Sequence, residues 1–288
     1  VDGAWLAQLG DGGYVLGSRA RQIRDGLRER DHFDEMDFLK LQLDDRALFF
    51  EHWHRLLLDT LTPEAVRADP RRGEIKRWVA NWSGRAAIDS VSYRVVRAFR
   101  EEVRNRAFWS LTAACRQADP HFDYTQIQQY EGPLWQLVTQ QPSHLLDPHY
   151  ADWPALLLEA ADAARDKLTA DGRPLAMHTW GDYNRVRIQH PFSRILPWLS
   201  DWLDMPTHSL PGDVHMPRVQ TLTSGASERM VVAPGREATG ILHMPSGQSG
   251  HPLSPFYRAG SDAWAQGEPT PLQPGPTKYR LELEPDSR

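Results

Sequence analysis

The chain has 288 residues, of which 40% are hydrophobic and 25% charged, a balance typical of globular proteins that bury a sizeable core. The formal net charge of −5 argues against nucleic-acid binding, because a nucleic-acid-binding domain needs a basic surface. No run of about 18 apolar residues is present, so the sequence predicts no membrane-spanning segment.

The first 170 residues are predicted to be mostly helical. Apolar residues recur about once per turn after Ser18, which is expected to be an N-cap. A second apolar stripe along residues 33–57 predicts one long helix that begins near Asp34 and is ended or restarted at Pro63. The same spacing predicts helices within residues 63–82, 86–117, 124–140 and 154–169.

After Gly172 the composition shifts to prolines and short alternating runs. These runs predict strands at 217–224, 227–234 and 240–245, and the last two form a hairpin candidate. Residues 278–284 alternate like a closing edge strand. Helices followed by a largely antiparallel sheet indicate an α+β fold, with a helical region at 18–172 and a strand-rich region at 173–288.

The stretch 244-MPSGQSGHPLSPFY-257 raises the question of a catalytic serine at Ser249. A nucleophile elbow requires the pattern G-x-S-x-G, and here the second glycine, Gly250, follows Ser249 directly. The elbow must also open a helix, which Pro252 and Pro255 prevent. The pattern therefore argues against Ser249 as the nucleophile.

Metal and nucleotide motifs are also missing from the sequence. The twelve histidines include no H-E-x-x-H pattern, and His52 and His54 are two apart, which points them to different faces of a helix. Gly-rich residues 10–13 are not followed by the Gly-Lys-Ser/Thr of a phosphate loop. The single Cys115 excludes an intrachain disulfide, and its apolar helical surroundings predict a small buried side chain.

Several segments together resemble the penicillin amidase family of N-terminal nucleophile hydrolases, which includes penicillin acylases and acyl-homoserine-lactone acylases. Residues 225–272 are similar to its C-terminal signature of a strand pair, a G-Q-S-G-x-P loop and a tryptophan-bearing segment. Further similar segments are 178-HTWGDYNRVRIQHPFSR-194, the Leu-Pro-Gly-Asp at 210–213, 14-YVLGSRARQIRDGL-27 and the Leu-Gln-Leu-Asp at 41–44.

This resemblance implies part of a four-layer αββα sandwich, in which the G-Q-S-G loop is structural. The family's nucleophile is the first residue of its large subunit, exposed by self-cleavage, and its α-amino group is the base. Neither that N-terminal Ser nor the oxyanion Asn can be placed on this chain. The resemblance thus implies a C-terminal part of the large subunit, with residues 1–17 as an entering loop, companion chains of the same precursor as partners and no activity alone.

One supporting residue is implied by the resemblance. Arg19 falls where the family carries an arginine that holds the oxyanion Asn in place, and Arg21 is the reserve candidate. No cofactor is expected for catalysis. Some members bind a structural calcium, for which Asp11 is the nearest match, although Ca²⁺ takes six to eight oxygen ligands. Members of the family are commonly exported to the periplasm, so the resemblance predicts a periplasmic location.

The function that the resemblance implies is hydrolysis of a small-molecule acyl amide through an acyl-enzyme on an upstream N-terminal Ser. The alternative, from another class, is a non-catalytic binding or interaction module that shares this half-fold. The acyl group that is accepted is not specified by these residues.

Overall fold

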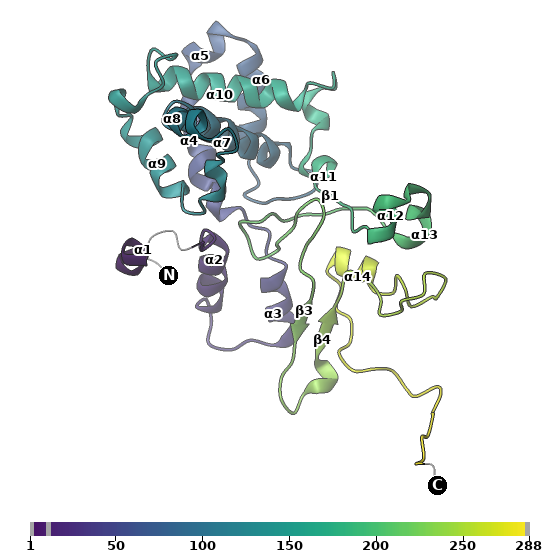
Figure 1. Ribbon diagram of the computed structural model, residues 1–288. Coiled ribbons are helices and arrows are strands. Elements are labelled where there is room, and N and C mark those ends of the chain that lie inside the picture. Colours follow the sequence, from purple (N-terminus) through teal and green to yellow (C-terminus); the bar gives the residue numbers. More distant parts are fainter. Residues whose placement is uncertain (1–2, 10–12, 286–288) are drawn as a thin grey trace.

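The computed structural model describes residues 3–9 and 13–285 (Figure 1). The α-helices are α1 (Gly3–Leu9), α2 (Ser18–Leu27), α3 (Glu35–Gln42), α4 (Glu51–Thr60), α5 (Pro63–Ala68), α6 (Arg71–Ala80), α7 (Val91–Trp109), α8 (Ala113–Ala118), α9 (Glu131–Gln140), α10 (Trp153–Leu168), α11 (Trp180–Tyr183), α12 (Pro191–Ile195), α13 (Ser200–Leu203) and α14 (Ser261–Gln266). The strands are β1 (Arg185–Val186), β2 (His208–Ser209), β3 (Arg229–Val231) and β4 (Ile241–His243). The predicted α+β class is confirmed. Within these residues, no helix has the length and apolar character to cross a bilayer.

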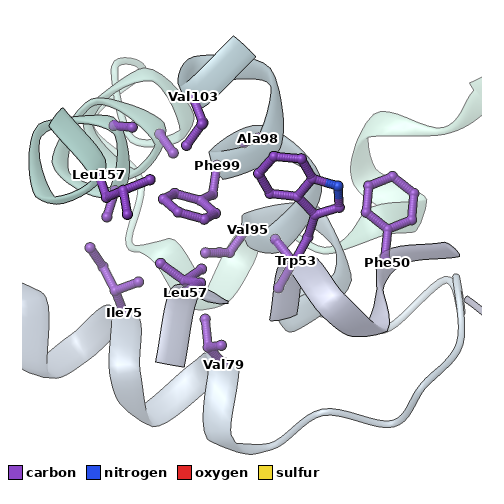
Figure 2. Packing of buried hydrophobic residues seen from close by; sticks show 14 of the residues in the cluster. Phe50, Trp53, Leu57, Ile75, Val79, Val95, Ala98, Phe99, Val103 and Leu157 are labelled. Carbon is purple, nitrogen blue, oxygen red and sulfur yellow. The ribbon is translucent and has the colours of Figure 1, made fainter. Parts of the chain in front are cut away.

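The main hydrophobic core lies among α4, α6, α7 and α10 (Figure 2). Trp53 and Leu57 of α4, Ile75 of α6 and Phe99 of α7 are fully buried there, and Leu157 of α10 packs against them. Burial of each such side chain contributes about 1.5–3 kcal/mol. Buried residues of α9 and Met216 of the loop at 213–216 belong to the same cluster, which fixes both segments to the helical body.

The long helix predicted from Asp34 is wrong, because the chain forms two helices there. α3 begins at a capping box made by Asp34 and Asp37 and ends at Gln42. The Asp44 carboxylate then accepts hydrogen bonds from the backbone and the guanidinium of Arg46, which stabilises a turn in place of the helix. The restart predicted at Pro63 is confirmed, with Pro63 as the first residue of α5.

Three local predictions are corrected by the structure. Ser18 is the first residue of α2, and Gly17 is its N-cap. The segment 1–17, expected to be a loop, contains the helix α1. Cys115 is exposed instead of buried, because the short helix α8 buries none of its residues.

The predicted hairpin is confirmed as the antiparallel pair β3–β4, with Met230 opposite Leu242. One face of the hairpin, with Val231 and Ile241, packs against Leu39 of α3. On β3 the side chain of Met230 points the other way and is 52% exposed. The hairpin therefore has one covered face and one open apolar face.

The remaining strand predictions are wrong. Residues 217–224 contribute only an isolated bridge between Gln220 and Gly225. Residues 278–284 are extended but form no strand, because no described residue pairs with them, and Tyr279 is 93% exposed. The short β1–β2 pair was not predicted from the sequence.

Candidate functional site

A cavity of about 510 Å³ lies where the start of α2 meets the helical body. Its walls come from the segment that leads into α2, from α7 and α9, and from the loop at 213–216. Four of its lining residues can carry charge: Arg19, Arg100, Glu131 and His215. This cavity contains the arginine that the sequence singled out.

Arg19 is half-buried on the cavity wall, in the first turn of α2. No residue that the structure describes forms a hydrogen bond or ion pair with its guanidinium. The N-cap, Gly17, has no side chain, so no side chain at the N-cap position accepts from the first N–H groups of α2. A free guanidinium beside a helix N-terminus favours an oxygen that carries negative charge or a strong carbonyl dipole.

Arg21, the reserve candidate, has a different environment. It lines a second cavity of about 570 Å³, which has Leu16 and Gly17 in common with the first. Its Nε lies 3.7 Å from the Asp25 carboxylate, and the side chain is 77% exposed. Arg21 is therefore a surface arginine with a partner.

A buried ion pair between α7 and α9 forms part of the cavity wall. Arg100 of α7 donates hydrogen bonds to Glu131 at the start of α9, and Glu131 also accepts one from Trp53 Nε1 at 2.7 Å. Burial would raise the pKa of the Glu131 carboxyl, but His52, Arg100 and Trp53 lower it to about 2. The pair is thus ionised and internally neutral at neutral pH.

The Leu-Pro-Gly-Asp segment ends in a second buried network. Asp213 accepts hydrogen bonds from Tyr93 Oη at 2.8 Å and from Arg97 Nε at 2.7 Å. Burial and the Asp213 carboxylate raise the pKa of the Tyr93 phenol well above its ordinary value, so the hydroxyl remains a donor. Asp213 thereby anchors to α7 the loop that carries His215.

His215 lies between these networks and α2. Its ring stacks on Phe49 with 4.2 Å between the centroids, and Nδ1 lies 3.5 Å from Ser18 Oγ. Burial and the Arg100 cation lower the pKa of the imidazole to about 4, so the ring is neutral at neutral pH. A neutral ring can donate at one nitrogen and accept at the other.

Ser249 lies in a loop that is held by its backbone. The Gly247 N–H donates to Tyr257 O at 3.0 Å, and a side chain at Gly247 would lie 1.7 Å from Phe256 O. Ser249 Oγ accepts a hydrogen bond from the backbone N–H of His251, a turn contact. These contacts agree with a structural loop and give Ser249 no activating base.

No group of three or more metal-ligating side chains exists among residues 3–9 and 13–285. Asp11, the calcium candidate, lies outside the described residues, so a calcium site at Asp11 stays a prediction. His52 packs on Trp135 and His54 stacks on Trp82, which gives both histidines packing roles.

The sequence analysis missed Arg100, Glu131 and His215 as lining residues. One signal was available: Arg97, Arg100 and Arg104 recur at i, i+3 and i+7 of one helix, so they share a face. Their acidic partners could not be read in this way, because Glu131 and Asp213 come from distant segments.

The comparison with known families agrees with the quoted segments. The family model described as penicillin amidase matches residues 2–279. The chain therefore belongs to the penicillin amidase family, whose members are amide-hydrolysing acylases. A search of curated proteins finds no match to the chain.

Proposed function

We propose that this chain is part of an acylase that hydrolyses the amide between a carboxylic acyl group and an amine. The nucleophile is an N-terminal Ser on a segment upstream of Val1, and the reaction passes through an acyl-enzyme. Family membership over residues 2–279 supports amide hydrolysis. The free guanidinium of Arg19 on the cavity wall is the observation that carries the finer proposal.

The chemistry of Arg19 fits a supporting role. Its planar fork offers five N–H donors in fixed directions, and in the described structure none of them is used. Such a fork can hold the side-chain oxygen of an upstream Asn and turn its N–H₂ group toward the reacting carbonyl. The Asn then donates to the oxyanion, while Arg19 keeps it in place.

The upstream Ser needs no histidine partner in this scheme. Its α-amino group, with an ordinary pKa of about 7.7–8.0, accepts the hydroxyl proton while Oγ bonds to the carbonyl carbon. The proton passes to the leaving amine as the C–N bond breaks. Water then hydrolyses the acyl ester and returns the Ser.

The open face of the β3–β4 hairpin supports a larger assembly. α3 covers one face, while Met230 on the other is 52% exposed and the apolar alternation of 278–284 is unpaired. A hairpin with both faces apolar needs a layer on each side to be stable. We propose that the rest of the same precursor supplies that layer and completes the four-layer αββα sandwich.

The experiment uses the full-length gene product that contains this chain. Hydrolysis of phenylacetyl and fatty-acyl chromogenic amides is measured for the wild type and for Arg19→Ala, Arg19→Lys and Arg21→Ala. We expect Arg19→Ala to lower kcat/KM by on the order of a hundredfold to a thousandfold, because the Asn that Arg19 holds would no longer donate to the oxyanion. Lys lacks the fork and should rescue little.

Arg21→Ala is the matched control, since Arg21 lies two residues away and is exposed. It should stay within about twofold of the wild type, as expected for a surface substitution. Wild-type kinetics for Arg19→Ala would remove Arg19 from the machinery. A stable, unprocessed product without hydrolysis of either amide would favour a binding module instead.

A further inference from the structure

The loop that carries His215 is fixed on both sides of this residue. Asp213 is held by Tyr93 and Arg97 of α7, and its own Oδ1 accepts the Val214 N–H at 2.7 Å. Met216, on the other side, is fully buried in the main core. The His215 backbone therefore has little freedom to move relative to α7.

The His215 ring is also fixed in orientation. It stacks on Phe49 at an interplanar angle of 26° and meets the edge of Phe50 with 5.7 Å between the centroids. This packing directs Nδ1 at Ser18 Oγ, 3.5 Å away. That distance is the outer limit of a hydrogen bond, and such bonds are often long until a site is filled.

Ser18 is the residue through which this rigid ring reaches Arg19. It is the first residue of α2, and Arg19 is the next. Gly17 gives the helix no side-chain cap, and the nearest tertiary anchor within α2 is Gln22, which bonds to Asp44 one turn later. The contact with His215 is thus positioned to set the direction of the first turn.

We propose that His215 is a positioning residue for Arg19: through Ser18 it orients the first turn of α2, and with it the guanidinium on the cavity wall. This inference rests on the proposed function, because it requires Arg19 to take part in the reaction. In this proposal His215 acts through Ser18 and Arg19 and takes no direct part in bond making or breaking.

The charge state of His215 follows from the groups that face it. Arg97 and Arg100 of α7 disfavour a protonated ring, while Asp213 of its own loop and Glu131 of α9 favour one. Burial adds to the effect of the cations and keeps the ring neutral near pH 7. A protonated His215 would add a second cation beside Arg100 to the cavity that Arg19 also lines, and would disturb the contact with Ser18.

The test compares His215→Leu and His215→Asn in the full-length product, each in the wild-type and the Arg19→Ala background. Leu keeps apolar packing without a hydrogen bond, whereas the Asn amide retains one near the position of Nδ1. We expect Leu to lower kcat by about tenfold to a hundredfold, the cost of a small misplacement, with KM unchanged. Asn should recover most of that loss.

The double variant gives the sharper result. If His215 acts through Arg19, His215→Leu has no further effect on kcat once Arg19 is Ala. Ser18→Ala removes the other half of the contact and should reproduce the kcat loss, which covers the case of a His215→Leu that does not fold. In the wild type, protonation of His215 should lower kcat as the pH falls. This acid limb of the kcat–pH profile should be absent from the His215→Asn variant.

His54→Leu is the control, because His54 stacks on Trp82 and bonds to Val79 O but does not line the cavity. It should change stability and leave kcat unchanged. Equal kcat losses from His215→Leu in both backgrounds, or wild-type kcat, would overturn the assignment. If the wild type hydrolyses amides and Arg19→Ala lowers kcat/KM as expected, the proposed function stands and the His215 variants test only the role of His215. A wild type that hydrolyses neither amide overturns the proposed function itself.

Discussion

The Asp213 carboxylate lies 2.7 Å from Arg97 Nε, with Asp213 only 2% exposed. This pair joins the Leu-Pro-Gly-Asp segment to the middle of α7, more than a hundred residues earlier in the chain. Arg97 also holds Glu101, one turn further along the same helix. The pair fixes the loop from which His215 reaches α2.

Replacing Asp213 with Asn should strongly destabilise the protein. The amide keeps the shape of the side chain but removes the charge that offsets Arg97 in the interior. Breaking a buried pair in this way costs about 3–5 kcal/mol, measured as the free energy of unfolding in denaturant. Asp201→Asn, at an exposed site, should change it by less than about 0.5 kcal/mol. Equal stability of the two variants would contradict the anchoring role.

The buried Glu131 predicts a specific loss of stability in acid. Its pKa of about 2 lies below the ordinary value of 4.5, so the unfolded state binds the proton more readily. The stability that the ionised Glu131 carboxylate contributes is complete above about pH 5. It is lost as the pH falls through the folded pKa, by on the order of 3 kcal/mol in total. Unfolding followed from pH 6 to pH 2 should show a steeper decline for the wild type than for Glu131→Gln. Parallel curves would disprove the depressed pKa.

The buried His215 ring also predicts a loss of stability in acid, but over a different pH range. Its folded pKa of about 4 lies below the ordinary 6.5, so the stability it contributes is complete above pH 6.5 and falls as the pH drops toward 4. His215→Asn should remove this part of the pH dependence, which is measured as the difference between the two unfolding curves. A difference that stays constant from pH 7 to pH 4 would show that the ring titrates normally.

Local patterns predicted the fold where neighbours in sequence decide the structure. The hairpin β3–β4 and the restart at Pro63 follow from alternation and from the lack of a proline N–H. The break between α3 and α4 did not, because the apolar stripe continues through it and the competing contact is the turn between Asp44 and Arg46. The edge strand at 278–284 failed because strand pairing requires a neighbour that the described residues do not provide.

Gly247 predicts a strict size limit in the G-Q-S-G loop. A side chain there would lie 1.7 Å from Phe256 O, a backbone atom that cannot move aside cheaply, whereas Gly250 has no atom within 4 Å. Gly247→Ala should therefore lower Tm by several degrees, corresponding to about 1–3 kcal/mol of overpacking, and Gly250→Ala should not. Equal Tm values in thermal unfolding would mean that this loop does not need its close backbone approach.

The open face of the hairpin predicts where the rest of the precursor packs. Met230→Asp should destabilise the full-length product by more than about 2 kcal/mol if another layer covers that face, since it buries a charge. Met177→Asp is the control, because Met177 is similarly exposed, at 54% against 52% for Met230. If denaturant unfolding gives the same small change in the free energy of unfolding for both variants, no second layer covers the open face of the hairpin.

The candidate site was predictable only in part. Arg19 was selected because its local sequence resembles a family segment, and the structure places it on a cavity wall with no partner among the described residues. His215 and Glu131 could not be found from sequence spacing. Each reaches the cavity through contacts between segments about a hundred residues or more from α2, and no local periodicity records such contacts.

The most direct test of the central claim is the location of the nucleophile. The full-length product is treated with a serine-directed sulfonyl fluoride, and the labelled residue is mapped by peptide mass spectrometry. We predict a label on the hydroxyl of an N-terminal residue that lies outside this 288-residue sequence, with hydrolysis of the amide lost in proportion to labelling. A label on Ser18 or Ser249, with the same loss of activity, would contradict the claim that this chain supports a nucleophile supplied by another segment.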